Sequence, residues 1–514
     1  MKSLFKTVAL ITVFTFLTRI LGFVFRIILS RSVGAEGIGI YQVASSIFMV
    51  LLTIIASGIP FIISRISAGY YADKKNKEAS SFVSVVLIFT LILSIAIALI
   101  VFVMQRFFAK MFTQVGGIAV LLALLPSLIF SAVYCVFRGD LWGKGNYFAL
   151  CVTEFYEQII RIVLSLLLIN ISFSALQNAF NLSLAMSIAC FFSMLLAIVM
   201  HFYYGGRLGK FKKGMLKPFL KQACPITFMR VAGSFVQPLV AIIIPMRLIA
   251  IGYTSSQALS LYGVAMGMTM PLLFVPTTII GSLSTALVPD ISTAVVQNNQ
   301  THIERRINFS LVFAMAVSAM FVPVFLGMGE ILGVFLFDNV LSGFLLQSSA
   351  WILLPLGLTN MSSSLLNSLG LENKSFYSFL LGAIVMFACI WLMTPLMGIN
   401  ALVLAMGLNY VVAFLMNYRL LKKHAKVNLK IGKMFLKFIC VIVPSGALTA
   451  FIVSLSEYIF PTFVILVVGS IVSFGSFILL SMTFNLIDIK TIYFAIKQKI
   501  NTKIKKKVKK HNFW

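Results

Sequence analysis

Two arginines in the first long apolar stretch of the chain could bind an anion. Arg19 and Arg26 lie seven residues apart in TRILGFVFRIILSRSVGAEGIGIYQVA, which begins at Thr18. Seven residues make about two helical turns, so both guanidinium groups lie on nearly one face, roughly 10 Å apart along the axis. An arginine near the bilayer centre costs at least ~2.5 kcal/mol and is rarely left facing lipid. We therefore expect Arg19 and Arg26 to line a cavity or path for an anion.

An internal repeat relates Arg26 to Arg247. The segment RIILSRSVGAEGIGIYQVA starts at Arg26, and RLIAIGYTSSQALSLYGVA, of equal length, starts at Arg247; both end in Tyr-x-Val-Ala. Transporters are commonly built from two such copies, with the substrate path between the halves. The repeat therefore predicts that Arg26 and Arg247 face each other across one cleft. The alternative is that each guanidinium group reaches the outer headgroups, as long side chains near helix ends readily do.

Two further arginines have two open interpretations each. Arg65 lies at the end of the second apolar stretch, after Ser57-Gly58-Ile59-Pro60. It could bind a phosphate at the cytoplasmic mouth of a cavity, or it could be an ordinary cationic anchor on the cytoplasmic side. Arg230 lies inside a later apolar stretch and could face the same cavity or form half of a structural pair.

Acidic residues occur within a predicted span in the segment TEFYEQIIRIVLS. Its residues Glu154, Glu157 and Arg161 follow the spacing i, i+3, i+7 and share one helix face. Glu157 and Arg161 are placed to pair at i, i+4. Such a pair makes charged residues tolerable inside a membrane, and this structural role is one interpretation. The other is a protonatable gate or coupling site whose pairing changes between conformations.

The elements that carry these residues are predicted to be membrane-spanning helices. The chain has 514 residues, of which 60% are hydrophobic and 11% charged. Apolar runs of at least ~18 residues are typical of transmembrane helices. We predict an all-α polytopic membrane protein with about fourteen spans, at 5–29, 38–63, 80–104, 117–137, 149–171, 181–204, 222–250, 258–286, 307–328, 346–367, 375–395, 399–419, 434–455 and 462–486.

The charge distribution predicts the orientation of these spans. The chain carries 41 Lys+Arg against 13 Asp+Glu, a formal net charge of +28. The basic residues gather in alternate connections, which places both termini in the cytoplasm. In a membrane protein such an excess indicates contact with anionic lipid headgroups, and we expect no nucleic-acid partner.

The repeat and the spans together predict the domain organisation. We expect an N-terminal lobe over 1–215 with spans one to six and a C-terminal lobe over 216–425 with spans seven to twelve. Two additional helices occupy 426–490, and a basic cytoplasmic tail occupies 491–514. The two lobes would be pseudo-symmetric and enclose a central cavity.

Signals for catalysis, metals and cofactors are absent from the sequence. The six cysteines show no paired spacing, the four histidines show no ligand spacing, and no Walker A sequence occurs. We predict no cofactor, no metal and no catalytic residue, so that the protein is not an enzyme.

Several segments together resemble a known transporter family. The opening segment from Thr18, FRGDLWGKGN, EQIIR and LYGVAMGMTMP are similar to the stage V sporulation protein B-like polysaccharide transporters. That family belongs to the multidrug/oligosaccharidyl-lipid/polysaccharide (MOP) exporter superfamily, with the lipid II flippases and the drug exporters. The resemblance implies two six-helix lobes working by alternating access in the bacterial cytoplasmic membrane. It also implies isoprenoid diphosphate-linked saccharides as substrates, with a role in sporulation or wall synthesis and cell-wall synthesis proteins as partners.

The resemblance carries over to single residues in part. Arg19 matches an arginine that lines the cavity of the lipid II flippases in their first helix, and Arg65 matches one in their second helix. Arg26 is displaced by one position from the next flippase arginine, where this chain has Phe25. LYGVAMGMTMP contains no counterpart of the flippases' arginine in helix eight. The implied substrate is therefore an anionic lipid-linked sugar related to lipid II.

We predict a flippase for an isoprenoid diphosphate-linked saccharide, with Arg19, Arg26 and Arg247 on the diphosphate and Arg65 and Arg230 as further partners. One alternative is a multidrug or cation exporter of the same fold, which would need acidic residues in its cavity. A membrane enzyme that polymerises lipid-linked glycans would need a large outer loop, and the predicted outer loops are short. A third alternative is a non-transporting scaffold of a cell-wall or spore-coat machinery.

Overall fold

The computed structural model describes residues 2–425, 431–456, 460–484 and 486. Every regular element among these residues is helical. Continuous helices are expected for apolar segments because backbone N–H and C=O groups in lipid must find partners within their own segment. The predicted basic tail over 491–514 lies outside the described residues.

The described chain forms two compact units. The first contains the chain up to Leu272 together with Leu336–Asp338 and Phe379–Asn409. The second contains Leu273–Phe335, Asn339–Ser378 and the chain from Tyr410 onward. The lobes expected from the repeat, 1–215 and 216–425, stay a prediction.

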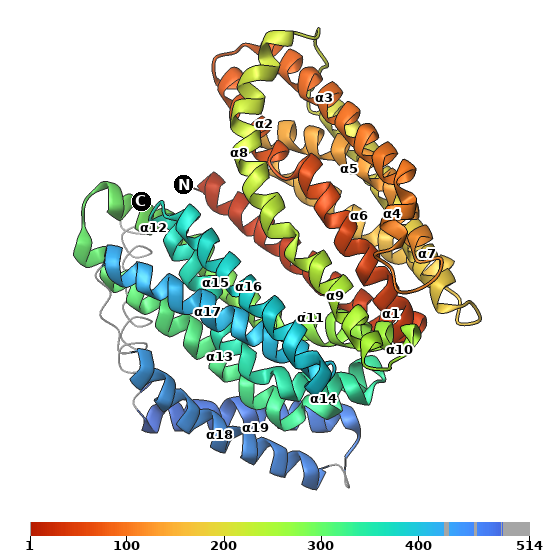
Figure 1. Cartoon of the computed structure of the whole chain (residues 1–514). Helices are drawn as coiled ribbons and strands as arrows, with labels where there is room; N and C mark the ends of the chain where they lie inside the picture. The colour runs from red at the N-terminus through yellow and green to blue at the C-terminus, as the bar shows by residue number, and fades with distance from the viewer. Residues whose placement is uncertain (1, 426–430, 457–459, 485, 487–514) are drawn as a thin grey trace, which may run out of the picture. The chain divides into compact units, whose positions relative to one another are not determined.

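The helices of the first unit carry all of the arginines and glutamates singled out above. They are α1 (Lys2–Ala56), α2 (Ile59–Ala72), α3 (Asn76–Val103), α4 (Gln105–Ala109), α5 (Ile118–Gly143), α6 (Tyr147–Leu168), α7 (Ala175–Tyr203), η1 (Lys213–Met215), α8 (Leu216–Ser234), α9 (Val236–Ala250), α10 (Ser255–Tyr262), η2 (Gly263–Thr269), α11 (Met270–Leu273) and parts of α16 (Glu372–Met397) and α17 (Asn400–Ala425) (Figure 1).

The long helix α1 consists of two helical segments that meet at Gly34. This residue has φ 75° and ψ 170°, far from helical values. A positive φ of this kind is readily adopted only by glycine, because a Cβ atom would clash with the backbone. The predicted spans at 5–29 and 38–63 therefore correspond to two segments of one helical stretch that changes direction at Gly34.

Side-chain caps mark where two helices of this unit begin. The Ser174 side chain accepts a hydrogen bond from the Gln177 amide at the start of α7. At the start of α10, Thr254 and Gln257 form a capping box in which each side chain bonds the other's backbone N–H. Such caps provide partners for the otherwise free amide groups of a first helical turn.

The interior of the first unit is built from close helix contacts. Phe82 of α3, Val136 of α5 and Phe219 of α8 belong to one buried apolar cluster with residues of α2. Gly139 of α5 lies directly against Pro60 of α2, at a point where a Cβ atom would come within 3.0 Å of the proline Cα. Small residues at such crossings let two helix backbones approach closely.

Helices α1, α10 and η2 cross at two glycines. A Cβ atom on Gly39 would collide with the carbonyl of Leu259, and one on Gly263 would collide with the carbonyl of Ala35. Gly263 begins η2, a buried π-helix of seven residues. Within the predicted span at 258–286 the structure has α10, the π-helix, α11 and the start of α12, so the helical path of this stretch is irregular. Pro276, near the N-terminus of α12, marks the last of these breaks.

The second unit is a separate set of packed helices. It contains α12 (Val275–Val296), α13 (Gln300–Phe337, except its last residues), α14 (Val340–Ser349), η3 (Ala350–Ile352), α15 (Leu353–Ser368), most of α17, α18 (Ile431–Ser456) and α19 (Thr462–Thr483). Helices α18 and α19 pack on each other and on α13. The α13 contacts are made at Gly327, which lies against Thr449, and at Gly469, which lies against Met328.

The number of membrane spans differs from the expected fourteen. Among the described residues, twelve helical stretches are long and apolar enough to cross a membrane, which agrees with the predicted all-α polytopic fold. Two differences account for the lower number. The first two predicted spans form one stretch from Val13 to Ala72, and α6, predicted at 149–171, is too rich in charged residues to be counted. The number fourteen is not confirmed.

Candidate functional site

The segment of α1 that carries the arginine strip, Arg19 and Arg26, packs against helix α6. Phe14 of α1 packs edge-on against Phe155 of α6, with ring centroids 5.8 Å apart. One helical turn beyond Arg19, a Cβ atom on Gly22 would lie 3.5 Å from the Gln158 side-chain nitrogen of α6. Gly22 of α1 thus lies against α6, while Arg19 is exposed and Arg26 is half-buried.

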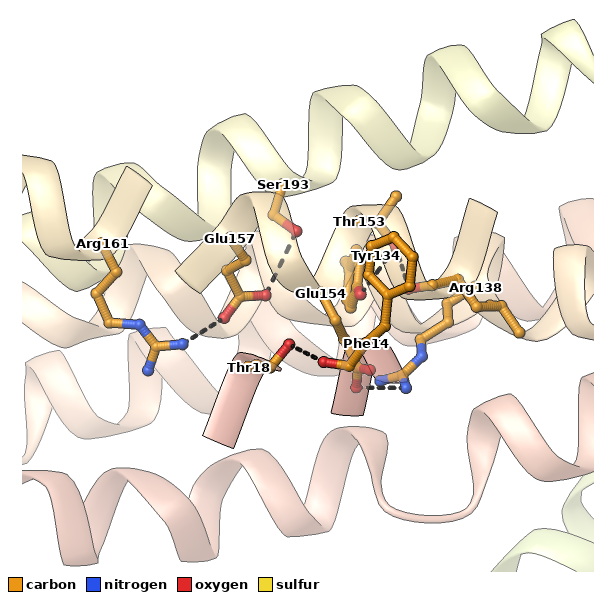
Figure 2. A network of polar contacts seen from close by, with 10 residues as sticks. Phe14, Thr18, Tyr134, Arg138, Thr153, Glu154, Glu157, Arg161 and Ser193 are labelled. Carbon is orange, nitrogen blue, oxygen red and sulfur yellow. Dashed lines mark hydrogen bonds and ion pairs between the residues drawn. The ribbon is translucent and has the colours of Figure 1, made fainter. Parts of the chain in front are cut away.

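The expected pair on α6 is present. Arg161 Nη2 lies 3.2 Å from Glu157 Oε1, and Ser193 of α7 donates a hydrogen bond of 3.3 Å to the other carboxylate oxygen (Figure 2). Both members of the pair are mostly buried, with 26% and 18% of their side chains exposed. The Glu157 carboxylate thus has a charged partner and a neutral donor, which makes its burial tolerable.

Glu154 has a partner that the sequence analysis did not assign. Arg138 Nη2 of α5 lies 2.6 Å from Glu154 Oε1 (Figure 2). The same guanidinium group lies 5.9 Å from the centre of the Tyr134 ring, and the Tyr134 hydroxyl is 3.3 Å from the Thr153 hydroxyl of α6. FRGDLWGKGN was expected to be a connection after the fourth span. Its residues up to Gly143 instead continue α5, which directs Arg138 toward α6.

Arg26 is half-buried and lacks a carboxylate partner. The Tyr41 side chain lies near both Arg26 and Arg161. Among the residues that the structure describes, no hydrogen bond or ion pair holds the guanidinium group of Arg26 or that of the exposed Arg19.

The charges around α1 and α6 do not cancel. The two carboxylates of α6, Glu154 and Glu157, are neutralised by Arg138 and Arg161. Among the described residues, Arg19 and Arg26 of α1 have no counter-charge, so the strip has two uncompensated positive charges. A dianion placed beside the strip would restore neutrality, whereas an organic cation would be repelled.

Arg247 makes contacts of a different kind. Its Nη2 donates a hydrogen bond of 2.8 Å to the backbone carbonyl of Trp391, and its guanidinium carbon lies 4.4 Å from the centre of the Trp391 ring. It occupies the last turn of α9, where a cation is favoured by the helix dipole. In this conformation Arg247 ties α9 to α16.

Arg230 and Arg65 lie outside the α1–α6 cluster, which consists of Arg19, Arg26, Glu154, Glu157 and Arg161. Arg230 of α8 donates a hydrogen bond to the carbonyl of Ser57, at the break between α1 and α2. Arg65 is exposed on α2, and no described residue forms a hydrogen bond or ion pair with it. Arg26 lies near Tyr41, and no described contact joins Arg19, Arg65, Arg230 or Arg247 to the charged residues of α6.

A second polar cluster was missed by the sequence analysis. Asp140 of α5 is fully buried and has three partners. The Tyr71 hydroxyl lies 2.6 Å from one carboxylate oxygen, while Lys144 Nζ and His201 Nδ1 lie 2.9 Å and 3.0 Å from the other. The only local signal was the i, i+4 spacing of Asp140 and Lys144, and it was obscured because this segment was taken for a connection.

Comparison with known proteins places the chain in a family. Residues 4–295, more than half of the chain, match the family described as "Polysaccharide biosynthesis protein". The chain belongs to this family. It is 25% identical over 444 residues to stage V sporulation protein B of Bacillus subtilis (strain 168), covering 83% of this chain and 85% of the relative. It is 20% identical over 477 residues to the lipid II flippase MurJ of the same strain, covering 84% of each.

Solved structures show that the fold is shared more widely. The chain superposes on a lipid II flippase MurJ in an inward closed conformation with a TM-score of 0.71 and 14% identity, over 93% of this chain and 98% of the other. An inward-facing MATE-family multidrug transporter of the MOP superfamily gives a TM-score of 0.66 at 16% identity, over 80% and 94%. The protein is thus a multi-pass membrane protein with the fold of these transporters, and its sequence is similar to those of stage V sporulation protein B and MurJ.

Proposed function

We propose that this protein moves an isoprenoid diphosphate-linked saccharide across the cytoplasmic membrane by alternating access. The observation that carries the proposal is the pair of uncompensated positive charges on α1, Arg19 and Arg26, beside an α6 whose two carboxylates are already paired. The relative named lipid II flippase supports a lipid-linked substrate of this class, and the relative named stage V sporulation protein B supports a role in the cell envelope.

A diphosphate fits the charge and the donor geometry of the strip. Arginine presents a planar set of N–H donors that binds phosphate oxygens with two parallel hydrogen bonds, and it stays charged in a low-dielectric site. Two such groups roughly 10 Å apart along one helix face can contact the two phosphates and the first sugar. The anion in turn lowers the cost of placing Arg19 and Arg26 inside a membrane.

The surroundings of Arg19 suit the lipid part of such a substrate. The neighbouring side chains of Phe16, Ile20 and Val24 are exposed, so apolar surface lies directly beside the cationic strip. An isoprenoid chain could pack on this surface while its diphosphate binds the arginines. The saccharide then needs only a polar path, and no covalent chemistry is required.

The α6 residues provide a switch for the cycle. Tyr41 lies near both Arg26 and Arg161. A diphosphate bound at Arg26 would therefore lie near enough to Arg161 to attract it and to weaken its pair with Glu157. A change of partner of this kind alters the charge at Glu157 as substrate binds. Glu154, Glu157 and Arg161 would thus act as gate or coupling residues, while Arg65, Arg230 and Arg247 stay predicted ligands of other conformations.

Binding by native mass spectrometry tests the proposal directly. The purified full-length protein is titrated with undecaprenyl diphosphate-linked saccharide, and wild type is compared with Arg19→Ala and Arg26→Ala. Because a hydrogen bond to a charged group contributes about 1.5–3 kcal/mol, we expect binding to weaken about tenfold or more in each variant. Arg106→Ala is the matched control, since Arg106 is exposed on α4, outside the cluster. Unchanged binding in both α1 variants would overturn the proposal and direct attention to cationic substrates.

A further inference from the structure

A cavity with a strongly cationic wall lies in the first unit, where the ends of helices α2, α3, α5, α6 and α7 meet. It has a volume of about 1040 Å³ and is lined by residues of the α2 C-terminus, the α3 N-terminus, the connection from α5 to α6 and the segment after α7. Its charged lining residues are all cations: Lys77, Lys144, Arg207, Lys210 and Lys212. None of them belongs to the α1–α6 cluster.

Four of these five cations have no carboxylate partner among the residues that the structure describes. Lys144 is paired with the buried Asp140, but no carboxylate of the described residues lies within ion-pair distance of the other four. Four like charges around one cavity repel each other, and this repulsion is relieved when an anion enters. The arrangement favours a ligand with several negative charges over one with a single charge.

Two helix N-termini add hydrogen-bond donors to the cavity. Asn76 and Lys77 are the first residues of α3, and Asn146 is the residue before α6; all three line the cavity. Neither helix has a side-chain cap that would bind its first amide groups. Free N–H groups at a helix N-terminus, together with the positive end of the helix dipole, bind phosphate oxygens well.

The wall of the cavity is held in place by buried contacts. Asp140 holds Tyr71 and Lys144, which both line the cavity. On the opposite side, the Gly209 amide donates hydrogen bonds to the Ser84 hydroxyl (2.9 Å) and to the Ser80 carbonyl (3.2 Å). A site whose wall is already ordered loses less entropy on binding than a flexible one.

We propose that this cavity binds an anion carrying at least two phosphate groups, at a site separate from the arginine strip on α1. Tyr71 and Tyr204 add flat apolar surface beside the cations, which would pack against the organic part of such a ligand. The phosphates could belong to a soluble diphosphate or to the headgroup of a lipid with two phosphates. The inference does not depend on the proposed function, because it uses none of the same residues.

Pyrophosphate binding to the full-length protein in neutral detergent provides the test. Isothermal titration calorimetry compares three proteins that all carry Arg19→Ala and Arg26→Ala, so that the arginine strip does not contribute. They are the parent, the cavity double variant Lys77→Gln/Arg207→Gln and the matched control Lys422→Gln/Lys423→Gln, whose lysines are exposed at the end of α17. We expect binding at least about tenfold weaker in the cavity variant and unchanged in the control, and restored by the charge-conserving Lys77→Arg/Arg207→Lys.

A competition experiment distinguishes the two sources of phosphate. Cardiolipin in mixed micelles is added to the pyrophosphate complex, with phosphatidylcholine as the neutral comparison. Displacement by cardiolipin alone assigns the site to a lipid headgroup, and no displacement assigns it to a soluble diphosphate. Equal pyrophosphate affinity in the cavity and control double variants, or no binding to the parent protein, would overturn the proposal.

Discussion

Arg138 of α5 and Glu154 of α6 form an ion pair in which Nη2 and Oε1 are 2.6 Å apart (Figure 2). Arg161 neutralises the other carboxylate of α6, Glu157. With both acidic groups paired, the uncompensated charge beside α6 is that of Arg19 and Arg26 on α1. These two pairs, one between α5 and α6 and one within α6, are the reason that the proposed ligand of Arg19 and Arg26 is an anion.

The Glu157–Arg161 pair should control affinity for the diphosphate in opposite directions. Glu157→Gln frees Arg161 to bind substrate, and we expect affinity for undecaprenyl diphosphate-linked saccharide to rise about threefold to tenfold. Arg161→Gln leaves Glu157 unpaired near the strip and should lower affinity by a similar factor. Native mass spectrometry titrations measure both. A shift of both variants in the same direction would show that the pair has only a structural role.

The contact between Gly39 of α1 and Leu259 of α10 should not tolerate a methyl group. In Gly39→Ala the new Cβ collides with a backbone carbonyl, so the two helices must separate. The free energy of unfolding should fall by roughly 1–3 kcal/mol, and the melting temperature in detergent should fall with it. Gly69→Ala on α2 is the control, because no atom lies within 4 Å of its added Cβ. There alanine should raise helix stability by up to about 1 kcal/mol. Equal melting temperatures for the two variants would contradict the tight crossing.

Asp140 should be among the residues most important for stability. Asp140→Asn removes the charge that compensates Lys144 and alters a contact of the buried His201, and breaking a buried pair costs about 3–5 kcal/mol. We expect a large drop in the denaturation midpoint of the purified protein. Asp73→Asn is the matched control, because Asp73 is 62% exposed in its pair with Lys75 and should change stability by less than about 1 kcal/mol. A neutral Asp140→Asn would mean that the network is not formed.

Arg247 tests the prediction from the internal repeat. In the structure its guanidinium group lies over the Trp391 ring and donates a hydrogen bond to the Trp391 carbonyl. Arg247→Met and Trp391→Leu should therefore each lower the free energy of unfolding by about 1 kcal/mol or more, which is seen as a lower melting temperature. Binding of the diphosphate lipid is measured in the same samples; it should remain in Trp391→Leu, and in Arg247→Met it separates a structural role of Arg247 from a role as ligand. Loss of binding in Arg247→Met at an unchanged melting temperature would instead support Arg247 as a substrate ligand, as its counterpart position to Arg26 predicts.

Parts of the site could be predicted because they depend on local spacing. Glu157 and Arg161 are one helical turn apart, so a single helix brings them together, and their pair was expected from the sequence. Arg138 and Glu154 are 16 residues apart on different helices, so their pairing depends on how α5 and α6 pack. The same holds for Asp140 and His201, whose contact appears only when α7 lies against α5.

The sequence by itself determined the fold class, since long apolar segments form helices from local hydrogen bonds and must avoid water. It also determined which charges lie within those helices, because residue order alone places Arg19 and Arg26 on one face of α1. Only the tertiary structure decided which of those charges have partners, through contacts such as Arg138–Glu154 and Arg247–Trp391 that join distant segments. It also showed where α10 gives way to a π-helix, at Gly263, whose backbone lies against that of Ala35 in α1. Electrostatic and packing energies of this kind depend on distances between helices, which residue order does not specify.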